Sequence, residues 1–202
     1  MNKLLAKKPN SIFDIISKDF FKEDLGLPQH DKYLYSGNYY EIYYALSAYY
    51  NPKSILEIGV RRGYSLISLI AGSDDVEYAE GWDIPHHRNQ NYVDNCLDGL
   101  DEKIKQFTSK EVSINLQYRN SQGIEKMERQ FDLIHVDGAH ERLDKIHDLN
   151  LIKDACKVVI IDDYKCHIVG PACDFFVQQN LDIIENIHNI DSMFGTLILE
   201  FK

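Results

Sequence analysis

The chain has 202 residues, which suits one compact domain and is too short for two of ordinary size. Hydrophobic residues make up 44% and charged residues 27%, a composition that excludes a fibrous or largely disordered protein. The formal net charge is −10, and no stretch gathers lysine and arginine into a basic face, so nucleic acid is not an expected partner.

The N-terminal residues and the cysteines bear on the cellular compartment. Residues 1–11 are basic but precede no apolar stretch long enough for a signal peptide, and no run of about 18 apolar residues occurs that could span a membrane. The cysteines form no C-x-x-C pair and match no zinc spacing, so we expect reduced thiols. These features predict a cytoplasmic protein with no membrane partner.

The first part of the chain differs from the rest. Residues 11–21 predict an amphipathic helix capped by Ser11, and residues 38–50 predict a second helix that is rich in tyrosine. Packing is the favoured explanation of these phenol rings, and a lid over a ligand site is the alternative. We expect residues 1–50 to form an N-terminal helical addition, which could also serve as an interface in a homo-oligomer.

From residue 51 to residue 202, short β-branched runs alternate with helix-like stretches. The expected strands lie within residues 53–59, 76–84, 111–119, 131–138, 157–163, 181–187 and 195–201, and the helix-like stretches are 64–72, 92–107, 123–130, 140–154 and 171–180. Several strands are nearly continuous apolar runs, as expected where helices cover both faces of a sheet. The pattern predicts an α/β domain with a mostly parallel sheet.

Ligands of open α/β sheets bind outside the carboxyl ends of the strands, so the residues that follow each strand are the candidate site residues. The first strand leads into a tight turn and a helix start, formed by Glu57, Gly59, Gly63, Tyr64 and Ser65. The turn lacks the G-x-G-x-x-G spacing of dinucleotide folds, and Glu57 would repel a phosphate. The cationic cofactor S-adenosylmethionine therefore fits better than a nicotinamide dinucleotide, and an oxidoreductase is the remote alternative.

The next two strand ends could hold the nucleoside part of such a cofactor. Asp83 is placed to accept hydrogen bonds from ribose hydroxyls, although a loop-capping role fits equally well. Asn120 and Ser121 could contact an adenine edge, or they could cap a helix.

Acidic residues gather after the fourth and fifth strands, where Asp137 precedes His140 and Asp162 precedes Asp163. Like charges about 4 Å apart repel by about 4 kcal/mol at intermediate dielectric, and a divalent cation would remove that conflict. Oxygen ligands favour magnesium or another hard cation, while capping and solvation at the rim are the alternative. His140 could be a general base, a group that supports the metal ligands, or an ordinary loop histidine.

These motifs resemble those of class I S-adenosylmethionine-dependent methyltransferases, and more narrowly the group of macrocin O-methyltransferase and related sugar O-methyltransferases. The resemblance covers residues 54–179 and is carried by ILEIGVRRGYSL, GWDI, FDLIHVDGAH with the later Asp148-Leu149, VVIIDDY and IVGPACDFF. It implies a Rossmann-like fold of seven strands with the last strand antiparallel. It also implies cofactor contacts at Glu57, Gly59, Gly63 and Asp83, and magnesium ligands at Asp137, Asp162 and Asp163.

One departure from the resemblance concerns the catalytic base. Several relatives have an aspartate proposed as the base two residues after the first metal aspartate, and this chain has Ala139 there. His140 is the expected substitute, beside Asp137. The sequence as a whole predicts a divalent-metal-dependent O-methyltransferase that acts on a hydroxyl of a small molecule, by resemblance a sugar. A metal-independent methyltransferase of the same fold and a non-catalytic cofactor-binding homologue are the alternatives.

Overall fold

The computed structural model describes residues 38–84, 97–108, 110–192 and 194–202. The helix predicted at residues 11–21, most of the proposed N-terminal addition and the loop 85–96 lie outside these residues. The strands are β1 (Ser54–Ile58), β2 (Tyr78–Asp83), β3 (Ser113–Tyr118), β4 (Phe131–Val136), β5 (Cys156–Ile161), β6 (Ile184–Ile190) and β7 (Thr196–Phe201). The helices are α3 (Asn38–Tyr50), α4 (Tyr64–Gly72), α5 (Leu100–Thr108), α6 (Arg142–Ile152) and α7 (Val169–Gln179), with a short 3-10 helix η3 (Ser121–Gly123).

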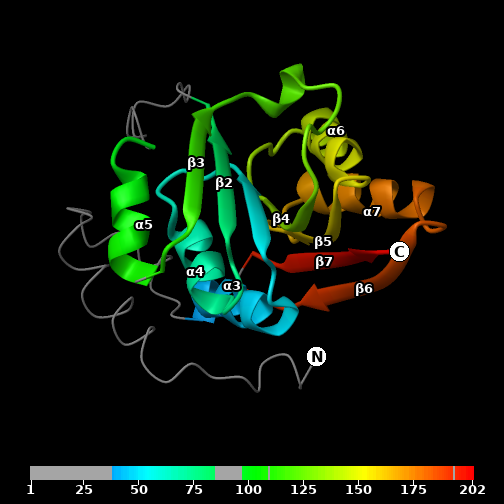
Figure 1. The fold of residues 1–202 in the computed structure, drawn as a ribbon. Helices are drawn as coiled ribbons and strands as arrows, with labels where there is room; N and C mark the ends of the chain where they lie inside the picture. Colours follow the sequence, from blue (N-terminus) through cyan, green and yellow to red (C-terminus); the bar gives the residue numbers. More distant parts are fainter. Residues whose placement is uncertain (1–37, 85–96, 109, 193) are drawn as a thin grey trace, which may run out of the picture.

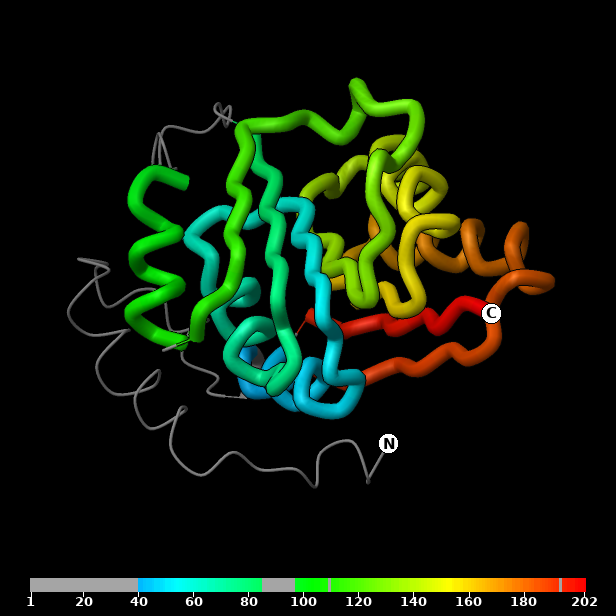
Figure 2. The backbone as a smooth tube through the Cα atoms, viewed as in Figure 1, coloured from blue at the N-terminus to red at the C-terminus, as the bar shows by residue number. Residues whose placement is uncertain are grey.

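All seven strands form one sheet, in the order β3-β2-β1-β4-β5-β7-β6. The pairs among β1 to β5 are parallel, whereas β7 runs antiparallel to both β5 and β6 (Figure 1). The chain leaves β1 towards β2 and β3, then returns to place β4 on the other side of β1 (Figure 2). The predicted Rossmann-like fold, a mostly parallel sheet with an antiparallel last strand, is therefore confirmed.

Helices cover both faces of the sheet, which explains the nearly continuous apolar strands. Successive strand residues point to opposite faces, so Ile55 packs with α3, α4 and α5 while its neighbour Leu56 packs with α6 and α7. Tyr43 is fully buried in the first of these layers and Phe176 in the second. The central strands are therefore fixed from both sides, and their carboxyl ends are held rigidly.

Residues 123–130 differ from the prediction, because the structure has no α-helix there. The Asn120 side chain accepts a hydrogen bond from the Gln122 N–H and caps the short helix η3, and Ile124 then adopts an extended conformation that ends it. Ile124 and Met127 pack against the α6 and α7 side of the core as irregular chain. These two residues are three positions apart, as on one face of a helix, but here they pack from the irregular connection between β3 and β4.

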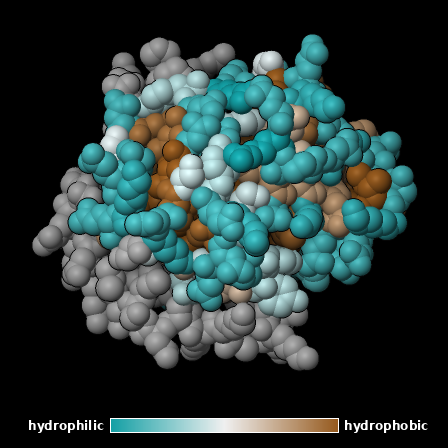
Figure 3. Space-filling view, viewed as in Figure 1, coloured by the Kyte–Doolittle hydropathy of each residue, from teal (hydrophilic) through white to brown (hydrophobic). Residues whose placement is uncertain are grey.

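The surface on the side shown in Figure 1 is mostly hydrophilic, with small apolar patches between the polar side chains (Figure 3). Among the described residues, no helix combines the length and the apolar character that crossing a bilayer would need. The described cysteines Cys156, Cys166 and Cys173 are free thiols.

Candidate functional site

The parallel register brings the ends of four strands into one row across the sheet. Ile58 of β1 is paired with Trp82 of β2 on one side and with Val136 of β4 on the other, and Val136 is paired with Ile161 of β5. The residues that follow in sequence are therefore neighbours in space: Gly59, Asp83, Asp137 and Asp162. This row is the carboxyl edge at which ligands of open α/β sheets bind.

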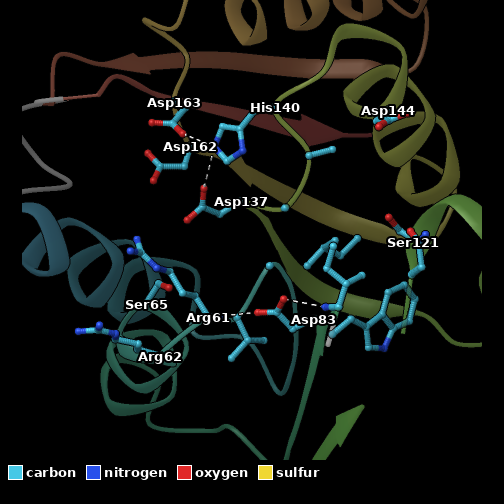
Figure 4. A pocket seen from close by; sticks show the side chains of 18 of the residues that line it. Arg61, Arg62, Ser65, Asp83, Ser121, Asp137, His140, Asp144, Asp162 and Asp163 are labelled. Atoms are coloured by element: carbon cyan, nitrogen blue, oxygen red, sulfur yellow. Dashed lines mark hydrogen bonds and ion pairs between the residues drawn. The ribbon is translucent and has the colours of Figure 1, made fainter. Parts of the chain in front are cut away.

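A cavity of about 770 Å³ lies at this edge. Most of the predicted site residues line it: Gly59, Tyr64, Ser65, Asp83, Asn120, Ser121, Asp137, His140, Asp162 and Asp163. Figure 4 shows Asp137, Asp162 and Asp163 grouped around His140, with Ser121 and Asp144 apart from them on the right of the view and Asp83 below. The cavity thus has an acidic end and a separate polar end.

The turn between β1 and α4 needs its glycines for two different reasons. Gly59 has φ +93°, and a Cβ there would lie 2.5 Å from the Asp137 carbonyl oxygen, so only glycine lets the two loops approach this closely. Gly63 has φ +76° and is the N-cap of α4, where no side chain caps the helix. The start of α4 at Tyr64 and Ser65 lies at the cavity with its helix dipole available for an anion.

The Asp83 carboxylate is held in place by backbone N–H groups. Oδ2 accepts a hydrogen bond of 2.5 Å from Arg61, and Oδ1 accepts one of 2.7 Å from Ile84. Arg61 has φ +49°, a left-handed conformation that is rare for a residue with a side chain. These two bonds fix the orientation of the carboxylate, whose oxygens can each accept more than one hydrogen bond.

Glu57 lies beneath the cavity and is not part of its lining. It is fully buried, and its Oε1 accepts a hydrogen bond from Ser65 Oγ and lies 2.6 Å from His135 Nδ1. Its Oε2 has no hydrogen-bond partner. Glu57 therefore lies behind Ser65, which does line the cavity.

The acidic end brings Asp137, His140 and Asp163 together. One ligand atom from each of these residues lies within 4.8 Å of the others. His140 Nε2 lies 2.6 Å from Asp163 Oδ2 and 4.0 Å from Asp137 Oδ1. Asp163 has φ +59°, so the backbone turns sharply where this side chain meets His140. Strained residues of this kind cluster at functional sites.

Asp162, the third expected metal ligand, lines the same cavity but does not belong to that group of three. Its side chain is almost fully buried, and its Oδ1 has no hydrogen-bond partner. Burial and the charge of Asp163 raise the pKa of Asp162 to about 7. Burial, with smaller contributions that include Asp163, raises the pKa of Asp137 to about 6. These carboxyl groups are costly to ionise together in the absence of a cation.

A comparison with known protein families shows to which family the chain belongs. A family model described as a methyltransferase domain matches residues 56–164, which is more than half of the 202 residues. The chain belongs to this methyltransferase family. The matched region begins in β1 and ends just after Asp163, so it contains the glycine turn, Asp83 and the acidic end of the cavity.

Solved structures with the same fold include methyltransferases from three other organisms. An O-methyltransferase from Bacillus cereus in complex with SAH is 15% identical, with 98% of this chain and 93% of that chain covered and a TM-score of 0.65. The O-methyltransferase TomG from Streptomyces achromogenes, which is involved in tomaymycin synthesis, was solved with SAM and is 14% identical, with coverages of 96% and 91% and a TM-score of 0.60. SAH-bound PaMTH1 from Podospora anserina is 17% identical, with coverages of 80% and 78% and a TM-score of 0.56. No curated protein matches this methyltransferase in sequence.

The cavity of this methyltransferase also contains residues that sequence reasoning missed. They include Arg61, Arg62, Arg119, Gln122, Asp144 and Phe194. Gln122 could have been found, because it follows Asn120 and Ser121 in the same turn. Phe194 has no local signal, since it reaches the cavity only through the connection between β6 and β7, whose residues Phe194 and Gly195 accept hydrogen bonds from Lys165 and Tyr164.

The tyrosines of α3 occupy different positions, some in the core and some at the cavity. Tyr43 is fully buried and its ring lies 4.6 Å from that of His135, so it is a packing residue of this methyltransferase. Tyr40 lines the cavity and meets the ring of Tyr64 edge to face at 5.7 Å. Desolvation and the nearby Asp137 charge hold the pKa of the Tyr40 hydroxyl well above its usual range. That hydroxyl therefore stays protonated at neutral pH.

Proposed function

We propose that the chain is an S-adenosylmethionine-dependent O-methyltransferase that uses a divalent cation and acts on a hydroxyl of a small molecule. One observation carries the proposal: a single cavity holds the anchored Asp83 carboxylate and, apart from it, the cluster of Asp137, His140 and Asp163. A cofactor bound along the cavity would reach from the polar end to the acidic end. The relatives of this fold that were solved with SAM or SAH support the same cofactor here.

The residues of the cavity fit S-adenosylmethionine in charge and polarity. Asp83 can accept hydrogen bonds from the ribose hydroxyls, and Asn120 and Ser121 lie where an adenine edge could bind. The uncapped start of α4 suits the cofactor carboxylate. The Glu57 Oε2 atom beneath the glycine turn is a buried acceptor with no hydrogen-bond partner, which suits the cationic amine and sulfonium better than a phosphate.

The acidic end fits a hard divalent cation. Most of its donors are the carboxylate oxygens that Mg²⁺ and Mn²⁺ prefer, beside one His140 nitrogen, and the buried Oδ1 of Asp162 has no hydrogen-bond partner. Asp137 and Asp163 would hold the ion, with Asp162 as a third ligand. A bound cation would lower the pKa of an acceptor hydroxyl and so make it a better nucleophile.

The protein's own residues would orient the acceptor and remove its proton. His140 Nε2 hydrogen-bonds to Asp163, and this bond raises the pKa of His140 above its usual value. An imidazole in that position can take a proton from a hydroxyl at the acidic end and share the positive charge with Asp163. A bound S-adenosylmethionine would supply the methyl group to the acceptor oxygen with its sulfur as the leaving group, and His140 would keep the proton.

The acceptor is proposed to be a sugar or glycan precursor, by resemblance to the sugar O-methyltransferases. A cavity of about 770 Å³ leaves room for a small acceptor beside the cofactor, within the range typical of small-molecule sites. Vicinal hydroxyls suit a site that offers several oxygen ligands to one cation. Neighbouring hydroxyls of this kind are common on sugars.

Two measurements on the purified protein test the proposal. Calorimetry with S-adenosylhomocysteine should show binding, and incubation with S-adenosylmethionine, Mg²⁺ and a panel of sugars and catechols should release S-adenosylhomocysteine. Chelator should abolish release while leaving the calorimetric signal. Release that persists in excess chelator would favour a metal-independent methyltransferase of the same fold. Cofactor binding without release from any acceptor would favour a non-catalytic homologue.

A further inference from the structure

A lysine that the proposed chemistry does not use lies buried behind the acidic end of the cavity. Lys145 belongs to α6, and its relative exposure is 1%. Lysine is almost never fully buried unless its charge is compensated, because removing an ammonium group from water is costly. The charge of Lys145 must therefore be balanced by groups of the surrounding protein.

The ammonium group of Lys145 lies where the ends of β4 and β5 meet. Its Nζ donates a hydrogen bond of 3.4 Å to the Val136 carbonyl oxygen. The same oxygen accepts a hydrogen bond of 3.3 Å from the Asp162 backbone N–H, and Val136 is followed directly by Asp137. The positive charge is thus fixed at a carbonyl shared by the two strand ends that carry Asp137 and Asp162.

Direct contacts compensate this charge only in part. An ammonium group has three hydrogens to donate, but among the described residues Lys145 Nζ has the one bond to Val136, which is longer than an ordinary N–H···O hydrogen bond. No carboxylate in the described parts of the chain forms an ion pair with Lys145. The charge is therefore balanced over a longer distance, by carboxylates that it does not contact.

Two carboxyl groups feel the charge of Lys145. Burial raises the pKa of Asp137, and the charges of His135 and Lys145 oppose that rise. Burial also raises the pKa of Asp148, which is opposed by the hydrogen bond from Ser121 and by the charge of Lys145. One of these two carboxylates, that of Asp137, belongs to the acidic end of the cavity.

Lys145 would act on a bound cation from behind. It is not among the residues that line the cavity, so neither the cofactor nor an acceptor would touch it. A cation would be held on the cavity side, among Asp137, His140 and Asp163. Two positive charges would then share the same carboxylates from opposite sides, and in a poorly solvated region they repel each other over several ångströms.

We propose that Lys145 is a positioning residue that weakens cation binding, because its fixed ammonium group partly neutralises the carboxylates that would hold the ion. The inference rests on the proposed function, since it assumes that the acidic end holds a divalent cation. Such a lysine stabilises the gathered carboxylates while the site is empty. It also makes the bound ion exchangeable, since part of the attraction is already used by the lysine.

Calorimetric titration of the full chain with Mn²⁺ at about pH 8 tests this. In Lys145→Met, whose apolar side chain is of similar length, the affinity for Mn²⁺ should rise by about tenfold or more, because a charge that repels the ion is removed. Lys145→Gln is equally neutral but keeps a group that can donate a hydrogen bond, so it should show the same gain. Lys157→Met removes an exposed lysine near the opposite end of β5 and should stay within about twofold of the wild type.

Thermal unfolding gives a second readout that does not depend on turnover. Added Mn²⁺ should raise the Tm of both neutral variants by more than that of the wild type, since tighter binding stabilises the folded state more. If one neutral variant fails to fold, the other decides.

Two results would overturn the inference and leave the proposed function in place. One is an affinity that is unchanged or lower in the neutral variants. The other is a gain in only one of two folded variants, because the loss of charge is what they share. Absence of Mn²⁺ binding in the wild type and in both variants would overturn the inference together with the metal dependence of the proposed function.

Discussion

His140 and Asp163 form a hydrogen bond of 2.6 Å between Nε2 and Oδ2, although 23 residues separate them in sequence. The bond joins the loop after β4 to the loop after β5 at the acidic end of the cavity. It also gives the imidazole a fixed orientation beside Asp137. This pair is the centre of the proposed proton transfer.

Replacing His140 tests its role as the base. In His140→Gln we expect kcat to fall by about 10²–10⁴, since that is the usual contribution of a positioned general base, while the affinity for S-adenosylhomocysteine stays within about twofold. Release of S-adenosylhomocysteine under saturating conditions measures the first quantity and calorimetry the second. His188→Gln is the control, because His188 pairs with Glu200 on β6 and β7, away from the cavity. Unchanged kcat in His140→Gln would remove the histidine from the mechanism.

The acidic cluster should make the metal-free protein less stable as the pH rises. Asp162 has a pKa of about 7 and Asp137 of about 6 in the folded chain, both above the ordinary value of 3.8, so the folded state binds more protons than the unfolded state. Its free energy of unfolding therefore falls between about pH 4 and about pH 7. His140, whose pKa is also raised, acts in the same direction.

Thermal unfolding in chelator measures this effect. Asp162→Asn removes one of the buried charges, so it should raise Tm at about pH 8 by a few degrees. The decrease in Tm between about pH 5.5 and about pH 8 should therefore be smaller in the variant than in the wild type. Mg²⁺ should raise the Tm of the wild type at about pH 8 more than that of the variant. If the Tm of the variant depended on pH in the same way as that of the wild type, the pKa of Asp162 would not be raised in the folded protein.

Asp83 should govern cofactor affinity without affecting the acidic end. Asp83→Ala removes the acceptor for the ribose hydroxyls and also releases the Arg61 N–H, so we expect the affinity for S-adenosylhomocysteine to fall by about tenfold or more. Glu77→Gln, a change at an exposed carboxylate on the approach to β2, is the matched control. An unaltered dissociation constant in Asp83→Ala would place the ribose elsewhere.

Replacing Gly59 tests how closely the β1 turn approaches the loop of Asp137, and replacing Gly99 controls for the effect of positive φ alone. Both glycines have positive φ, at +93° and +69°, but a Cβ at Gly59 would clash with Asp137 while nothing lies within 4 Å of one at Gly99. Gly59→Ala should therefore lower Tm by more than Gly99→Ala, by an amount that reflects an additional cost of about 1–3 kcal/mol. Equal losses of Tm would mean that the loop of Asp137 can move away freely.

The strands, the crossover helices and the row of strand-end residues could be predicted from the sequence, because they depend on local periodicity and on a general rule of α/β sheets. The pairing of Glu57 with His135 could not, since it requires knowing that β4 lies beside β1 in a register that makes these two residues direct partners. Nothing in the local pattern separates His135 from an ordinary strand residue.

The different positions of the three acidic residues could not be predicted either, because they depend on tertiary geometry. Sequence placed Asp137, Asp162 and Asp163 together, but the positive φ of Asp163 turns its side chain towards His140, and Asp162 is left more deeply buried. Likewise, Asp148 appeared in the sequence only as part of a motif. Its bonds to Ser121 and Gln122 exist because α6 packs against the turn after β3.

The most direct test of the account is a crystal soaked with S-adenosylhomocysteine and Mn²⁺, examined by anomalous diffraction. We predict an anomalous peak between the carboxylates of Asp137 and Asp163, and a nucleoside whose ribose hydroxyls contact Asp83. A nucleoside bound away from Asp83, or a cavity with cofactor but no manganese at the acidic end, would contradict the claim that one carboxylate-lined pocket holds both.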